Sequence, residues 1–123
     1  AQTIRYPNQS SVKFGNSLAL YKNMLVVSAP LEDSGNYSDA GALYVYSRKD
    51  PQSPFVLLKK IASPQPFDQM KLGSAALALN SSYIVATTFN SNRIEIFRIE
   101  GKEIPFHTTL EMPYYGPSDI GIT

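Results

Sequence analysis

The stretch FGNSLALYKNMLVVSAP, residues 14–30, begins a unit that the chain repeats, because it occurs again in altered form as LGSAALALNSSYIVATT, residues 72–88. Aligned without a gap, the two copies pair Phe14 with Leu72, Gly15 with Gly73 and Val26 with Ile84. Downstream, ALYVYSR from Ala42 corresponds to RIEIFRI from Arg93. Self-similarity at a spacing of this size is typical of a fold assembled from similar structural units.

A third opening of the same kind, Ile120-Gly121, stands close to the end of the sequence. The runs that precede the openings, TIRYP, KIASP and LEMP, each end in proline. The openings therefore divide the chain into the last strand of a preceding unit with a linker (1–13), a first unit (14–71), a second unit (72–119) and the start of a following unit (120–123).

Each unit contains four short runs of β-prone residues with turn residues between them, and no stretch has the sustained periodicity of an amphipathic helix. The predicted strands are 17–20, 24–29, 41–48 and 55–62 in the first unit, and 75–79, 83–89, 93–99 and 104–112 in the second. The sequence therefore predicts an all-β fold of consecutive four-stranded antiparallel sheets.

These predicted strands carry apolar residues on both faces, as Leu43 and Val45 point one way while Tyr44 and Tyr46 point the other. An antiparallel sheet with one solvated face would alternate apolar and polar residues instead. Sheets stacked around an axis as the blades of a β-propeller are covered on both sides. The alternative is a β-sandwich, whose two outer faces are polar; the repeat favours the propeller, because a sandwich has no reason to repeat its sequence sheet by sheet.

The first copy resembles the FG-GAP repeat, a family that includes the propeller head of integrin α subunits. The resemblance rests on the opening Phe14-Gly15, on Ser28-Ala29-Pro30 at the place of Gly-Ala-Pro, and on Gly41 before the third strand. The second copy departs from the pattern, since it has Leu72-Gly73 and Ala86-Thr87-Thr88 at these places. We expect the glycines to adopt positive φ or to allow a neighbouring sheet to approach closely, and Phe14 and Leu72 to lie between sheets.

Integrin-like copies bind calcium through an acidic loop between the first and second strands, but this chain has Tyr21-Lys22-Asn23 and Asn80-Ser81-Ser82 there, without a carboxylate. In the acidic loop 31–41, the alternate positions from Asp33 are Gly35, Tyr37 and Asp39, which does not match a calcium loop. We therefore predict a calcium-free repeat with no metal and no cofactor.

Residues that could carry catalysis are few. The single histidine, His107, lies in a predicted strand, and the sequence contains no nucleophile elbow, phosphate loop or zinc motif. Cysteine is absent as well. We expect a protein that binds or assembles and is not an enzyme.

Three Asn-x-Ser sequons begin at Asn8, Asn36 and Asn80, and they are candidate glycosylation sites that favour a secreted or cell-surface protein. The net charge of +1 and the absence of a long apolar run argue against nucleic acid and a membrane span. Tyr114 and Tyr115, between prolines, could contact a protein or glycan partner.

Two blades are too few to close a propeller, which takes about four to eight. We therefore expect either a fragment of a longer propeller or a chain that assembles with its own copies into a ring or filament. Two functions follow: an extracellular adhesion or recognition module that binds a protein or glycan, and a self-assembling structural unit.

Overall fold

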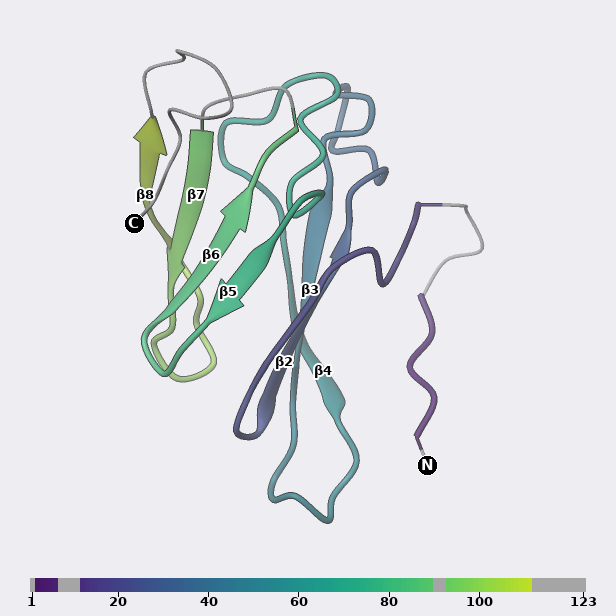
Figure 1. Cartoon of the computed structure of the whole chain (residues 1–123), viewed down its shortest axis with the longest axis vertical. Helices are drawn as coiled ribbons and strands as arrows, with labels where there is room; N and C mark the ends of the chain where they lie inside the picture. Colours follow the sequence, from purple (N-terminus) through teal and green to yellow (C-terminus); the bar gives the residue numbers. More distant parts are fainter. Residues whose placement is uncertain (1, 7–11, 90–92, 112–123) are drawn as a thin grey trace.

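The computed structural model describes residues 2–6, 12–89 and 93–111, which form two four-stranded antiparallel sheets and no helix (Figure 1). The first sheet has the order β1 (Leu18–Tyr21), β2 (Met24–Ala29), β3 (Ala42–Ser47) and β4 (Val56–Ile61). The second has the order β5 (Leu77–Leu79), β6 (Tyr83–Thr87), β7 (Arg93–Arg98) and β8 (Phe106–Glu111).

The eight predicted strands are confirmed, and each boundary lies within two residues of the predicted one. Turn residues account for this agreement. Lys22 (φ 52°) adopts a left-handed conformation in the β1–β2 hairpin, and Gly101 (φ 64°) does so between β7 and β8. Each strand connects to its neighbour in sequence, so each unit is a simple meander.

The register of the strands corrects the gapless alignment of the two units by one residue. Leu18 pairs with Val27 in the first sheet, and Leu77 pairs with Ala86 in the second. Leu18-Ala19-Leu20 therefore corresponds to Leu77-Ala78-Leu79, and not to residues 76–78. The reason is one additional residue between Gly73 and its strand, which reverses the face that each strand residue occupies.

The alignment of the third strands is confirmed by a matching irregularity. The β3–β4 ladder shifts register between Val45 and Tyr46, and the β7–β8 ladder shifts between Ile96 and Phe97. These are the residues that the sequence alignment from Ala42 and Arg93 pairs with each other.

With this register, the two sheets stack head to tail. Val26 of the first sheet lies in the core between the sheets, whereas its counterpart Val85 is not part of that core. Conversely, Ala86 lies in this core, and its counterpart Val27 lies in a second cluster on the far side of the first sheet. Equivalent faces thus point in the same direction, as they do in successive propeller blades. The first strands of the two sheets, β1 and β5, also contact each other.

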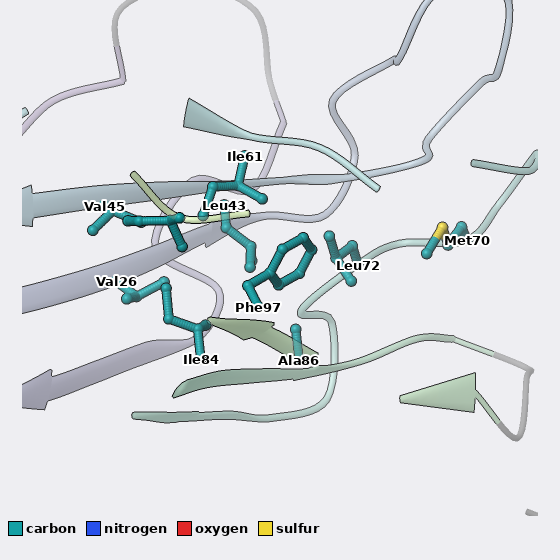
Figure 2. Packing of buried hydrophobic residues seen from close by; sticks show 10 residues of the cluster. Val26, Leu43, Val45, Ile61, Met70, Leu72, Ile84, Ala86 and Phe97 are labelled. Carbon is teal, nitrogen blue, oxygen red and sulfur yellow. The ribbon is translucent and has the colours of Figure 1, made fainter. Parts of the chain in front are cut away.

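The core between the sheets, which we call the internal interface, is apolar and closely packed (Figure 2). From the first sheet it contains Val26, Leu43, Val45 and Ile61, from the β4–β5 connection Met70 and Leu72, and from the rest of the second unit Ile84, Ala86, Phe97 and Ile104. The ring of Phe97 points into this cluster and packs edge-on against Phe106, at 5.7 Å between ring centroids. A fully buried Leu, Ile or Phe contributes about 1.5–3 kcal/mol relative to an exposed one.

Residues 2–6, which we call the N-terminal arm, form no strand in the structure, although the sequence predicts one at residues 3–6. The arm instead lies beside the first sheet, where Ile4 and Tyr6 pack on the second cluster. Gln2 exchanges two hydrogen bonds of 2.8 Å with the backbone of Phe55. The assignment of this segment to a preceding unit, and the other unit boundaries, remain predictions.

Candidate functional site

Motif residues of the first unit contact motif residues of the second. The amide of Leu72 donates a hydrogen bond to the carbonyl of Ala40 (2.9 Å), and a Cβ placed on Gly41 would lie 2.4 Å from the nitrogen of Leu72. A Cβ on Gly73 would lie 2.8 Å from the Cβ of Ser28. Gly41 and Gly73 both have positive φ, at 90° and 80°. Both glycines are therefore required by conformation and by the close approach of the two units.

Gly15, the counterpart of Gly73, has the same kind of backbone but a different environment. Its φ is 91°, yet no described atom lies within 4 Å of a Cβ placed on it. The amides of both glycines donate to the end of the second strand, Gly15 to Ser28 O (2.9 Å) and Gly73 to Thr87 O (2.7 Å). Each unit therefore presents the same opening, and of the two openings that the structure describes, the second has a sheet against it.

The outward face of the first sheet, which we call the head face, repeats the chemistry of the second sheet's share of the internal interface. Six of its apolar residues correspond to residues of the internal interface or packed against it: Leu18, Leu20, Leu25, Val27, Tyr46 and Leu57 are the counterparts of Leu77, Leu79, Ile84, Ala86, Phe97 and Phe106. Tyr44 departs from this pattern, because its counterpart is the buried carboxylate Glu95. Phe14 lies on this face, where its ring and that of Tyr6 pack against Tyr44 at 5.5 and 5.7 Å. Leu18 and Leu20 remain about 60% exposed.

A buried carboxylate holds the N-terminal arm on the head face. Glu32 accepts hydrogen bonds from the hydroxyl of Tyr6 (2.7 Å) and from that of Tyr44, and it forms an ion pair with Lys60. Burial acts to raise the pKa of Glu32, but the hydrogen bonds from Lys60, Tyr44 and Tyr6 outweigh it, so the pKa lies below its ordinary value. Glu32 is therefore ionised at neutral pH and fixes the arm.

The outward face of the second sheet, which we call the tail face, repeats the first sheet's share of the internal interface. Its apolar residues are Val85, Ile94, Ile96 and Leu110, the counterparts of Val26, Leu43, Val45 and Ile61. The four counterparts in the first sheet are at most 5% exposed. On the tail face, by contrast, Leu110 is 48% exposed, and the other three residues are partly buried. An apolar sheet face of this kind is typical of a contact surface.

At the upper end of the sheets in Figure 1, the β2–β3 loop and the β4–β5 connection interlock. Ser38 donates its amide to Asp68 Oδ1 (2.9 Å), and Gln69 donates its own to Ser38 O (2.8 Å). Asp33 likewise accepts a hydrogen bond from the amide of Asp39. The described residues contain no group of three His, Cys, Asp or Glu placed to hold a metal ion.

The remaining candidate residues do not gather into one place. Ser28, Ala29 and Pro30 are buried at the end of β2, and Ser28 Oγ accepts a hydrogen bond from the amide of Ser17. His107 is exposed and packs against Tyr83 on the tail side, at 5.4 Å between ring centroids.

Two of the three candidate glycosylation sites lie within the described residues. Asn36 is exposed at the tip of the β2–β3 loop, and Asn80 occupies the β5–β6 turn. Asn8, Tyr114, Tyr115, Ile120 and Gly121 lie outside the described residues.

Cavities lined by described residues open near the hairpin turns. One of about 620 Å³ lies between the arm and the β3–β4 turn, and one of about 280 Å³ lies between the β1–β2 and β5–β6 turns. Neither is lined by a carboxylate or a histidine. No helix among the described residues is long and apolar enough to cross a membrane.

Sequence reasoning missed the contact of the arm with Glu32. Tyr6, Glu32 and Lys60 are far apart in the sequence, so no local pattern connects them. The available signal was the single glutamate at the end of the apolar run MLVVSAPLE, since an ionised residue there needs partners.

Comparison with known proteins supports the repeat. Residues 8–46 match the family model of the FG-GAP repeat, which covers the opening Phe14-Gly15, both strands of the first hairpin and most of the third strand. No curated protein and no solved structure gives a significant match. The chain therefore contains an FG-GAP repeat at residues 8–46, which lies in the first of two four-stranded units that stack like propeller blades.

Proposed function

We propose that this chain is a non-catalytic extracellular adhesion or recognition module, part of an FG-GAP-type propeller that binds a protein or glycan partner. The observation that carries the proposal is the interlocked pair of loops at the upper end of the sheets. Backbone hydrogen bonds from Lys71 and Leu72 to Asp39 and Ala40 join the two connections at 2.9 Å each. Loops fixed on a rigid β scaffold are common recognition surfaces.

The upper loops also expose suitable contact groups. Tyr37 is 44% exposed and pairs with Ser34 through two backbone hydrogen bonds of 2.9 and 3.0 Å, which rigidifies the tip. An aromatic side chain on a rigid loop gives contact area at low entropic cost. FG-GAP repeats are typical of extracellular proteins, and a glycan on Asn36 would stand beside this tip.

A binding assay on intact cells tests this proposal. Fluorescently labelled chain is measured on cells before and after treatment with trypsin or with mixed glycosidases, so that a protein partner and a glycan partner give different losses. Tyr37→Ala is expected to weaken binding about tenfold, and Lys102→Ala, at the opposite end, to leave it unchanged. Equal loss in the two variants, or binding that survives both treatments, would contradict the proposal.

A second candidate function is a self-assembling structural unit, and a separate observation favours it. The head face and the tail face are both apolar, and each repeats one half of the internal interface. Contacts of this head-to-tail kind produce rings or filaments. Sedimentation velocity of the isolated chain distinguishes this function, because a defined oligomer or fibre supports it and a monodisperse monomer contradicts it.

A further inference from the structure

We propose that the tail face binds the head face of a second copy of this chain, with Leu110 of one copy replacing Ile4 of the other. This inference rests on the second candidate function, self-assembly, and names the surfaces and the residue exchange that it would use. It is independent of recognition by the upper loops.

The match between the two outward faces and the internal interface carries the argument. Within the chain, Val26, Leu43, Val45 and Ile61 pack against the opening and strands of the second unit. The tail face offers an aliphatic residue at each of the four corresponding positions: Val85, Ile94, Ile96 and Leu110. The face of one copy is therefore chemically equivalent to the surface that the chain already covers.

The head face supplies the complementary half. Met70 and Leu72, which precede Gly73, are completely buried in the cluster shared with the first sheet, and Val12 and Phe14 hold the same places before Gly15. Lys13 and Lys71 have matching positive φ values of 56° and 50°. The first opening thus has the same backbone conformation as the opening that packs against a sheet. No described residue lies within 4 Å of a Cβ on Gly15, whereas a Cβ on Gly73 meets Ser28.

The N-terminal arm occupies part of the head face in the single chain. The proline-ended runs align Ile4 with Ile61, and Ile61 is the buried β4 residue of the internal interface. Ile4 packs on the head face in the corresponding role. The tail face of another copy brings Leu110, the counterpart of Ile61, so the arm and the second copy compete for one place. The arm therefore acts as a replaceable cover.

Opposite effects of two substitutions test this competition by sedimentation of the full chain. Leu110→Lys places a charge on the tail face and is expected to raise the dissociation constant at least about 30-fold. Ile4→Ser loosens the arm and is expected to lower the constant severalfold, and the double variant Ile4→Ser/Leu110→Lys should lose that gain. Lys102→Ala is the control. Circular dichroism shows that each variant is folded, and Ile96→Lys is a second tail-face variant.

Cross-linking tests the geometry directly, since the chain has no cysteine. Asn16 Nδ2 donates to Ser74 O within the chain at 2.7 Å, and Ser74 is itself the counterpart of Asn16. Head-to-tail contact therefore places Ser74 of one copy beside Asn16 of the next. A short bismaleimide should join Ser74→Cys and Asn16→Cys chains when mixed, and it should not join Ser74→Cys to Lys102→Cys. The doubly substituted chain Asn16→Cys/Ser74→Cys is the positive control, linked within one copy.

The outcomes separate this inference from self-assembly in general. Oligomers whose dissociation constant is unchanged by Leu110→Lys and Ile96→Lys would support self-assembly but overturn the proposed contact. Cross-linking of Ser74→Cys to Lys102→Cys as readily as to Asn16→Cys would have the same meaning. A monomer at all concentrations, including with Ile4→Ser, would overturn both.

Discussion

Leu43 and Ile94 hold the same position in the two sheets, yet Leu43 is completely buried in the internal interface and Ile94 is only partly buried on the tail face. The same contrast separates Gly73, which meets Ser28, from Gly15, which meets no described atom. Equivalent positions of the two units thus carry similar residues but differ in burial and in their contacts. Among the described residues, the difference lies in whether a neighbouring sheet is present, so matched substitutions at equivalent positions measure the contribution of that neighbour.

The largest difference is expected between alanine at Gly41 and alanine at Gly15. The two glycines have nearly identical φ values, 90° and 91°, so the cost of placing a side chain in this conformation, about 1–2 kcal/mol, is shared. Only Gly41 approaches a backbone, that of Leu72, and overpacking adds about 1–3 kcal/mol. Urea unfolding should therefore give losses of about 4 kcal/mol for Gly41→Ala and about 1 kcal/mol for Gly15→Ala.

Equal losses at Gly41 and Gly15 would show that backbone conformation alone accounts for both glycines. The close approach of the two units would then have no energetic consequence at this point.

The next largest difference is expected between Leu43→Ala and Ile94→Ala. Truncation of a completely buried leucine leaves a cavity and costs about 3 kcal/mol, whereas the partly buried Ile94 loses less apolar contact, about 1 kcal/mol. Thermal unfolding of both variants at low protein concentration, where the chain is alone, measures the difference. If Ile94→Ala is as destabilising as Leu43→Ala, the tail face is covered in the single chain.

The sequence predicted the strands well because their limits are set locally, by turn residues and by runs of β-prone residues. It predicted the stacking of the sheets from the apolar residues on both faces, such as Leu43 and Tyr44. It placed the second unit's first two strands one residue out of register, because the conserved-looking glycine was used as the anchor and Ala75 is an insertion after it. A one-residue shift is invisible in composition but exchanges the two faces of a strand.

The candidate site was less accessible to sequence reasoning than the fold. The contacts of Gly41 with Leu72 and of Gly73 with Ser28 follow from the repeat only once the stacking direction is known. The contact of Tyr6 with Glu32 joins residues 26 apart, through a segment that resembles a strand in sequence. The arm lies on the head face because that surface is available to it, and which surface is available depends on how the whole molecule folds.

The attachment of the N-terminal arm through Glu32 is expected to depend on pH. Because the pKa of Glu32 is lowered in the folded chain from an ordinary value of 4.5, its contribution is complete above that value and is lost as the pH falls below it. Glu32→Gln removes the charge from buried hydrogen bonds and should cost about 2 kcal/mol at pH 7. Urea unfolding from pH 7 to pH 3 should show the wild type approaching the variant in acid.

Tyr6→Phe is the matched control for Glu32→Gln, since it removes the hydroxyl from the same carboxylate while the aromatic packing with Tyr44 and Phe14 remains. Tyr6→Phe should lower the free energy of unfolding by less than Glu32→Gln does, and its stability should depend on pH in a similar way to that of the wild type. A gap between wild type and Glu32→Gln that is constant with pH would contradict an ionised Glu32 as the group that holds the arm.

The smallest expected effect distinguishes the two first hairpins. In the second unit, Asn80 Oδ1 accepts hydrogen bonds from the amides of Ser82 and Tyr83, both at 2.8 Å, whereas the first unit turns through Lys22 in a left-handed conformation. Asn80→Ala should therefore cost about 1 kcal/mol, and Lys22→Gly should gain about 0.5 kcal/mol by removing the conformational strain. Differential scanning calorimetry of both variants measures these shifts.

Asn80 is also a candidate glycosylation site, so its substitution in a secreted chain would change two properties at once. Ser82→Ala separates them, because it destroys the sequon while the backbone amide of Ser82 still donates to Asn80 Oδ1. Chain made in bacteria should lose stability with Asn80→Ala and retain it with Ser82→Ala. An equal loss in the two variants would assign the effect to the serine side chain, and the second hairpin would then depend on its turn sequence in a different way from the first.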